Sequence, residues 1–222
     1  MIRQLMRSRR KQILVDISTQ WFFFKDPADF AHQQKVLANI RRLMAWARLK
    51  NIPVISTCQI YANSNGSSAT QYSIDTPAVR KLRFTLLNDR IVFPPDSSMD
   101  MPCDVLRNYH QIILQERCSD PFDEPRSERL FTEVVANEFI IIGANAEDAV
   151  QATALGLLQR GKTVSVVTDA ITWRDRSEAS LAFRKMQAKG AHLTESSRIA
   201  GKSHLSSPGL NRRLCVRLEQ KN

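Results

Sequence analysis

The stretch Glu138-Phe-Ile-Ile-Ile-Gly143-Ala-Asn-Ala-Glu-Asp-Ala149-Val-Gln-Ala-Thr-Ala-Leu-Gly156-Leu-Leu-Gln-Arg-Gly161 decides the fold of this 222-residue chain. Its residues 139–142 form an unbroken apolar and mostly β-branched run, which is typical of a parallel strand buried on both faces. Gly143 permits a sharp turn. Glu147 and Asp148 then favour the start of a helix, because negative side chains are stabilised in its first turn. Gly161 suits the position directly after the last turn of that helix. The sequence therefore predicts a strand, a tight turn and a helix.

Many α/β hydrolytic enzymes carry their nucleophile on such an elbow, and the corresponding position here is Ala149. A methyl group has no nucleophilic atom. The backbone N–H groups at a helix start are unpaired, so the elbow still offers donors to an anion above the strand end. From the spacing alone, an ordinary strand–helix unit without chemistry explains the stretch equally well.

Length and composition predict a single sizeable α/β domain. The chain is 43% hydrophobic and 24% charged, which is ordinary for a globular protein. No apolar run approaches the roughly 20 residues of a membrane span, and the basic start lacks the apolar core of a signal peptide. We therefore expect a cytoplasmic protein with no membrane partner. Because the cysteines form no CxxC pair, we expect no metal and no disulfide scaffold, and we expect no cofactor; the four are Cys58, Cys103, Cys118 and Cys215.

The net charge of +10 lies at the two ends of the chain. Residues 1–11 and residues 198–222 each carry a net charge of +5, whereas residues 12–197 are neutral. We therefore divide the chain into a basic N-terminal arm (1–11), an α/β domain (12–197) and a basic C-terminal tail (198–222). Because no nucleic-acid motif and no interleaved aromatic residues accompany these charges, nucleic acid is disfavoured as a ligand.

Strand-like and helix-like segments alternate along the domain. This alternation predicts a doubly wound, Rossmann-like three-layer sandwich with a parallel sheet of about six strands. The expected strands are residues 12–17, 53–58, 111–116, 139–142, 163–168 and 191–193. The expected helices are residues 29–50, one that begins at Thr76-Pro77, one from Glu124-Pro125 to about residue 136, the elbow helix, and residues 175–189; residues 93–104 are expected to be irregular.

Ligands of such folds bind beyond the carboxyl ends of the strands. The residues at those ends are Asp16, Thr57-Cys58, Glu116-Arg117, the segment 144–149 and Asp169, of which Asp169 is expected to cap a turn. We expect Trp21 and the three phenylalanines after it to belong to the core or to the wall of a pocket, and their place close after Asp16 also suits the mouth of a cleft. Together with Ala144, Asn145 and Asp148, Trp21 completes the set of predicted binding residues. A dinucleotide or P-loop function is disfavoured, because the chain has no GxGxxG or GxxxxGK[ST] motif.

Four segments resemble the isochorismatase-like cysteine hydrolase family, which includes nicotinamidases, N-carbamoylsarcosine amidases and isochorismatases. They are Ile13-Leu-Val-Asp16, Ile113-Leu-Gln-Glu116-Arg-Cys-Ser-Asp-Pro-Phe122, the elbow 143–161, and Val164-Ser-Val-Val-Thr-Asp169-Ala. The resemblance runs from about Gln12 to Leu193. It implies an Asp–Lys–Cys triad in which the aspartate takes the thiol proton, the lysine polarises the site and the thiolate attacks a carbonyl carbon.

Carried over onto this chain, the resemblance retains one member of the triad. The aspartate is Asp16, the lysine position falls at Glu116 (or Gln115), and the cysteine position falls at Ala149. The histidine metal motif of nicotinamidases is replaced by Thr57-Cys-Gln-Ile-Tyr-Ala-Asn, and Ser18 stands where the family has a glutamine, with Gln20 close by. Two replacements in one triad favour a naturally divergent member over a single introduced substitution.

Three hypotheses remain open. In the first, the chain is a catalytically degenerate protein that binds a small molecule or serves in an assembly, as a homo-oligomer by analogy with the family. In the second, it is a hydrolase of C–N, ester or ether bonds with a rewired site. There Asp16 and Glu116 lie close together as acid and base, or as ligands of a hard cation, and Cys58 or Cys118 replaces the nucleophile. A simpler interpretation of the acids is helix capping by Glu147 and Asp148 with an Arg117 ion pair. In the third, the basic ends bind a partner.

Overall fold

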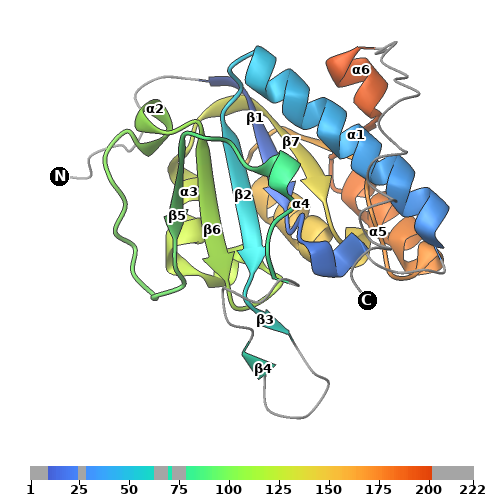
Figure 1. Ribbon diagram of the computed structural model, residues 1–222, viewed down its shortest axis with the longest axis horizontal. Helices are drawn as coiled ribbons and strands as arrows, with labels where there is room; N and C mark the ends of the chain where they lie inside the picture. Colours follow the sequence, from blue (N-terminus) through green and yellow to red (C-terminus); the bar gives the residue numbers. More distant parts are fainter. Residues whose placement is uncertain (1–9, 25–28, 63–69, 72–78, 202–222) are drawn as a thin grey trace, which may run out of the picture.

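The computed structural model describes residues 10–24, 29–62, 70–71 and 79–201. Its centre is one parallel sheet of seven strands in the order β5-β6-β2-β1-β7-β8-β9 (Figure 1). The strands are β1 (Arg10–Ile17), β2 (Val54–Gln59), β5 (Arg90–Phe93), β6 (Gln111–Glu116), β7 (Ala136–Gly143), β8 (Val164–Ile171) and β9 (His192–Thr194). A separate antiparallel pair consists of β3 (Tyr61–Ala62) and β4 (Thr70–Gln71).

Helices cover both faces of the sheet and make it the middle of three layers (Figure 1). The long helix α1 (Phe30–Leu49) and the short α6 (Ser196–Ala200) lie on one face. Helices α3 (Pro125–Glu133), α4 (Gln151–Gln159) and α5 (Arg176–Ala188) lie on the other, and α2 (Val105–Asn108) precedes β6. The predicted doubly wound α/β sandwich is therefore confirmed.

Each central strand supplies two hydrophobic cores, because successive side chains of a strand point to opposite faces. In β1, Ile13 and Val15 join the core beneath α3, α4 and α5, whereas Leu14 joins the core beneath α1. In β7, Ile141 and Ile140 divide in the same way. This burial on both faces explains the continuous apolar runs of these strands.

The structure corrects three details of the predicted elements. The sheet has a seventh strand, β5, at its edge, where alternate side chains are exposed and the apolar signal is weak. The predicted helix at Thr76-Pro77 begins outside the described residues, and its described part, Val79 to Leu87, holds a short 3₁₀ turn, Arg83–Thr85, instead of an α-helix. Residues 1–9 and 202–222 of the predicted arm and tail also lie outside the described residues, while residues 198–200 belong to α6.

The elbow after β7 has the predicted form. Gly143 has φ of 127°, and a Cβ atom on it would lie 1.9 Å from the backbone oxygen of Ile17. Only glycine fits this turn, because a side chain would clash with the end of β1. The next N–H, of Ala144, donates to the same Ile17 oxygen at 2.9 Å, which fixes the elbow against the neighbouring strand. One π-helical turn, Ala146–Val150, then leads into α4.

None of the described helices is both long and apolar enough to cross a membrane.

Candidate functional site

Asp16, at the carboxyl end of β1, forms a buried ion pair. Its carboxylate is fully shielded from solvent. Oδ2 lies 3.0 Å from Nζ of Lys81 and accepts a hydrogen bond of 2.9 Å from Oγ of Ser56 on β2. The second oxygen, Oδ1, is buried and has no hydrogen-bond partner among the described residues. A buried polar atom without a partner is costly in free energy, so Oδ1 marks a place where the structure lacks a donor.

Lys81 supplies the cation next to Asp16, and the sequence analysis missed it. Besides the ion pair, its Nζ donates to the backbone oxygen of Thr57 at 3.0 Å, and its side chain is only 3% exposed. The assignment of the lysine position to Glu116 is therefore wrong in geometry, since the ammonium beside the aspartate comes from the segment between β4 and β5. With a lysine beside Asp16, the argument from two replaced triad positions no longer holds.

Hydrogen bonds fix the segment that carries Lys81 onto the sheet. The N–H of Leu82 donates to the oxygen of Thr19 at 2.9 Å, and Nε2 of Gln20 donates to the oxygen of Val79 at 2.6 Å. On β6, Nε2 of Gln111 donates both to Oγ of Ser56 and to the oxygen of Thr85, at 2.8 and 2.9 Å. Hydrogen bonds from the segment after β1 and from β6 therefore hold Lys81 next to Asp16, although the segment that carries the lysine is not an α-helix.

Glu116 lies on the other face of the sheet from Asp16. Asp16 is paired in register with Ser56, and Ser56 with Ile113, so these three side chains share one face. Glu116 is three residues beyond Ile113 and therefore points to the opposite face, where Oγ of Ser127 on α3 donates to its Oε1 at 3.2 Å. Strand β2 also separates β1 from β6. The predicted closeness of Asp16 and Glu116 is wrong for both reasons.

The environment of Glu116 favours its neutral form. The carboxyl is 1% exposed, and burial raises its pKa well above the ordinary value, with Ser127 acting in the opposite direction. The charges of Glu124 and Asp120 raise the pKa further. Glu116 is therefore a structural residue between the sheet and α3, and burial holds its pKa above the ordinary value.

Ala149 packs into the core at the start of α4. It is 3% exposed and belongs to the hydrophobic cluster beneath α3, α4 and α5. The acids before it do not cap α4, which has no side-chain hydrogen bond at its N-cap. Oε1 of Glu147 accepts from the backbone N–H of Arg174 at 2.7 Å, and Oδ2 of Asp148 lies 3.7 Å from Nη2 of the Arg174 guanidinium. The predicted partner Arg117 instead lies 3.7 Å from Glu124.

Neither cysteine proposed as a substitute nucleophile is activated. Burial raises the pKa of Cys58 to about 11, although the nearby Lys81 acts in the opposite direction. Burial and the neighbouring Asp123 raise the pKa of Cys118 to about 12. Because the thiolate is the reactive form, both groups are protonated and weakly nucleophilic at neutral pH. Cys58 donates to the oxygen of Val79 and Cys118 to Asp123, at 3.6 and 3.5 Å.

The other predicted binding residues divide into exposed and buried groups. Trp21 is 52% exposed, consistent with the mouth of a cleft, and Ala144 and Asn145 are buried in the elbow. Asp169 has a structural role: its two oxygens accept from the N–H and Oγ of Ser196 at 2.8 and 2.7 Å, and Oδ2 also accepts from Asn39 at 3.0 Å. Asp169 thus joins β8, α1 and α6. Within the described part of the chain, no group of three or more His, Cys, Asp or Glu side chains is arranged to hold a metal ion.

A parallel α/β sheet with a buried Asp–Lys pair at the end of its first strand defines the class of this protein. The family model described as the isochorismatase domain matches residues 12–198. The chain belongs to the isochorismatase family.

Solved structures support the same fold. The chain is similar to the MAR1 ribonuclease from Caenorhabditis elegans, with 22% identity, a TM-score of 0.59 and coverage of 87% of this chain and 82% of that one. It is also similar to an isochorismatase-like hydrolase from Alkaliphilus metalliredigens, with 11% identity, a TM-score of 0.62 and coverage of 86% of this chain and 97% of that one. A third similar structure is the zinc complex of a pyrazinamidase from Pyrococcus horikoshii, with 15% identity, a TM-score of 0.55 and coverage of 83% of this chain and 99% of that one. These identities establish the fold alone. No curated protein sequence is significantly similar to this chain.

The Lys81→Met substitution is expected to lower the free energy of unfolding by about 3–5 kcal/mol, because it leaves the buried Asp16 carboxylate without a cation. Urea denaturation measures this change. Adding Asp16→Asn to Lys81→Met should recover part of the loss, and Lys35→Met on the exposed side of α1 should have little effect. Equal losses in Lys81→Met and Lys35→Met would contradict the ion pair.

The Glu116→Gln substitution is expected to change how stability depends on pH. In the unfolded chain Glu116 ionises near its ordinary pKa of about 4.3, whereas burial raises its pKa in the folded protein. The stability of the wild type relative to Glu116→Gln should therefore fall as pH rises above that value, by up to about 1.4 kcal/mol per pH unit, until the folded pKa is passed. Urea denaturation between about pH 4.5 and 7 tests this, with the exposed Glu195→Gln as control. A pH-independent difference would show that Glu116 is ionised in the fold.

Proposed function

We propose that this chain is a catalytically degenerate isochorismatase-like protein that binds a small molecule at the carboxyl edge of its sheet. The observation that carries the proposal is the retained Asp16–Lys81 pair at 3.0 Å beside an elbow whose nucleophile position is Ala149. A methyl group forms no thioester, so covalent catalysis by the family's route has no acceptor atom.

The polar groups at this edge favour a ligand with a donor and an acceptor side by side. None of the residues that the structure describes donates a hydrogen bond to Oδ1 of Asp16. Lys81 uses its ammonium on Asp16 and Thr57, and an ammonium has three protons to donate. A primary amide, which carries N–H donors next to a carbonyl oxygen, matches both groups. The ligand class of the proposal is therefore a small amide or a related carbonyl compound.

The rewired hydrolase is the alternative function, and the geometry disfavours each of its versions. Asp16 and Glu116 face opposite sides of the sheet, so they do not form an acid–base pair. Cys58 and Cys118 have raised pKa values. The similar C. elegans structure is a ribonuclease, but the described residues of this chain hold no group of three or more His, Cys, Asp or Glu side chains that could bind a metal ion for such a reaction. A role in an assembly, as a homo-oligomer, stays compatible with the degenerate site.

Hydrolysis assays test the proposal. The wild-type chain should hydrolyse nicotinamide, N-carbamoylsarcosine and isochorismate no faster than the Asp16→Asn variant, because both lack a nucleophile. Calorimetric titration with nicotinamide should detect binding to the wild type and weaker binding to Asp16→Asn. Turnover that disappears in Asp16→Asn would overturn the degenerate site. Equal binding by both proteins would overturn the assignment of the ligand to Asp16.

A further inference from the structure

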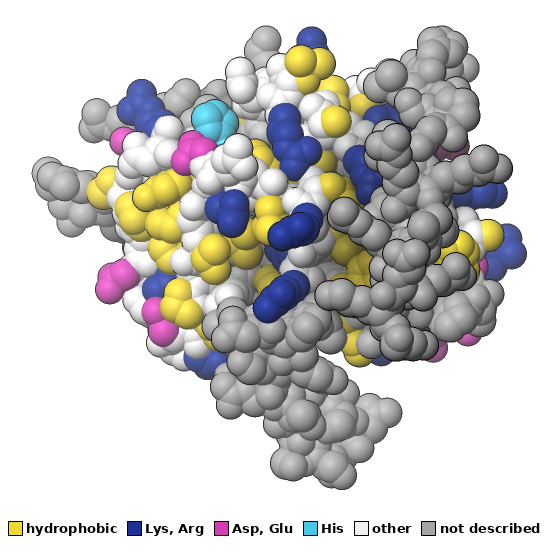
Figure 2. Space-filling model, viewed as in Figure 1, with side chains coloured by type: hydrophobic (Ala, Val, Ile, Leu, Met, Phe, Trp, Pro, Cys, Tyr) yellow, Lys and Arg dark blue, Asp and Glu magenta, His cyan; other side chains and the backbone are white. Residues whose placement is uncertain are grey.

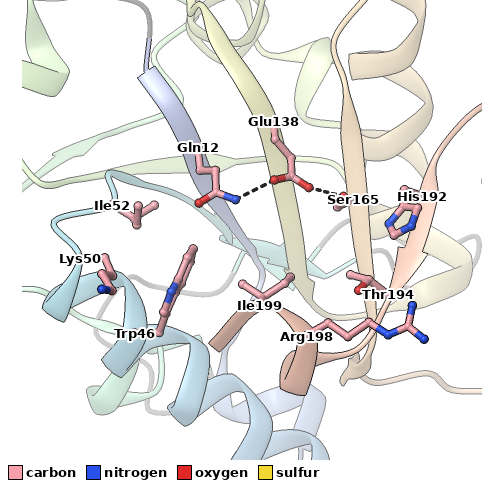
Figure 3. Close-up of a pocket in the computed structure, with 10 residues that line it drawn as sticks. All are labelled: Gln12, Trp46, Lys50, Ile52, Glu138, Ser165, His192, Thr194, Arg198 and Ile199. Atoms are coloured by element: carbon pink, nitrogen blue, oxygen red, sulfur yellow. Dashed lines mark hydrogen bonds between the residues drawn. The ribbon is translucent and has the colours of Figure 1, made fainter. Parts of the chain in front are cut away.

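A cavity lies at the edge of the sheet opposite the Asp16–Lys81 pair, where the strands begin. Its volume is about 570 Å³, within the usual range for small-molecule sites of about 300–1,000 Å³. It lies between the start of β1, β7 and β8, the strand β9, the end of α1 and the helix α6 (Figure 3). The Asp16–Lys81 pair is at the other end of the same strands, so this cavity is not part of the site described above.

A row of hydrogen-bonded polar side chains forms the wall of this cavity on the sheet. Glu138 on β7 accepts at one oxygen from Nε2 of Gln12 on β1, at 2.7 Å, and at the other from Oγ of Ser165 on β8, at 2.5 Å (Figure 3). On the same face of β1 and β7, the residues one step further along are Leu14 and Ile140, which are core residues. Each of the three strands thus has a polar side chain at this cavity and an apolar core residue at the next position on the same face. The polar side chains therefore form a continuous wall of the cavity.

The carboxylate of Glu138 can accept more hydrogen bonds than it receives. Each of its oxygens has two lone pairs, and the Gln12 amide and the Ser165 hydroxyl use one on each. Glu138 is only half-buried, so these lone pairs are open to the cavity. A ligand in contact with this wall should therefore carry N–H or O–H donors.

Positive charges stand at both ends of the cavity. Lys50 lies beside Trp46 at one end, and Arg198 and His192 lie at the other, with Glu138 between them (Figure 3). Within the described residues, neither Lys50 nor Arg198 forms an ion pair with a carboxylate. Two cations without anionic partners at one small cavity favour an anionic ligand.

Helix α1, whose C-terminal end borders the cavity, is basic along its length. Helix α1 carries four Lys or Arg residues and no acid: Lys35, Arg41, Arg42 and Arg48. Figure 2 shows basic side chains gathered on the face of the molecule that α1 covers, with Asp and Glu mostly toward its borders. Such a field raises the local concentration of anions and speeds their association.

An aromatic wall completes the set of contacts. Trp46 is half-buried and lines the cavity next to Ile52. An indole face against an aliphatic side chain accepts a flat ring, and the planar contact adds to the burial of apolar area. The cavity thus offers a flat apolar wall, hydrogen-bond acceptors and cations within one volume.

We propose that the cavity lined by Trp46, Lys50, Glu138 and Arg198 is a second small-molecule site, which takes an organic anion built on a flat ring with N–H donors. The ring packs on Trp46, the donors face Glu138, and the carboxylate or phosphate group meets Lys50 or Arg198. Both a mononucleotide and an amino-substituted aromatic acid such as 4-aminobenzoate have this chemistry. This proposal does not depend on the proposed function of the Asp16–Lys81 site at the carboxyl edge of the sheet, or on the ligand that binds there.

Calorimetric titration of the full chain with adenosine monophosphate and with 4-aminobenzoate tests the proposal. At least one probe should bind with a Kd below about 1 mM, and adenosine, which lacks the anion, should bind at least tenfold more weakly than its monophosphate. Binding of the nucleotide alone would assign the site to nucleotides, and binding of 4-aminobenzoate alone to aromatic acids. The absence of binding by both probes would overturn the proposal.

Variants locate the binding. Lys50→Ala together with Arg198→Ala should raise the Kd of the bound probe at least tenfold. Glu138→Gln should also raise the Kd, because the amide replaces one hydrogen-bond acceptor with a donor. Arg184→Ala together with Lys185→Ala removes the same charge from the exposed side of α5 and should change Kd less than twofold. Asp16→Asn should leave Kd unchanged. Equal losses in both double variants, or a loss in Asp16→Asn alone, would overturn the proposal.

Discussion

The buried contact between Asp16 and Lys81 is the interaction on which the carboxyl edge of the sheet depends. Removing a carboxylate from water costs several kcal/mol unless a cation and hydrogen-bond donors compensate, and here Lys81 and Ser56 do so. To reach Asp16, the lysine has to lie across the end of β2. That requirement explains why the segment from Val79 to Leu87 is held by Thr19, Gln20 and Gln111 although it has little regular structure.

The Asp16–Lys81 pair lies next to an elbow that has the expected backbone but no nucleophilic side chain. The charge pair and the glycine elbow at Gly143 are present, and the elbow still places the start of α4 next to the end of β1. Ala149 has a methyl group in place of a thiol, which would give its proton to Asp16 and attack a substrate. An intact charge pair with an unpartnered oxygen on Asp16 is the setting of a binding site, which is why binding and not turnover is proposed.

Much of the fold could be predicted from the sequence because it depends on local signals. The continuous apolar run of β7, the helix α1 and the glycine of the elbow each follow from neighbouring residues. The partner of Asp16 could not be predicted in this way. Lys81 comes from a segment without periodicity, 65 residues further along the chain, and lysine is rarely buried. The opposite orientation of Asp16 and Glu116 depends on the register of three strands, which the sequence alone does not specify.

The central claim is that Ala149 stands in the nucleophile position beside a buried Asp–Lys pair, and mass spectrometry with peptide mapping of the labelled protein tests it most directly. The wild type and Ala149→Cys are each incubated with an electrophilic carbonyl or acrylamide probe near neutral pH. The account predicts an adduct mapped to residue 149 in the variant, and no adduct at Cys58 or Cys118 in either protein, because those thiols are protonated. Rapid modification of Cys58 in the wild type would contradict the account, since it would show an active thiolate beside Lys81.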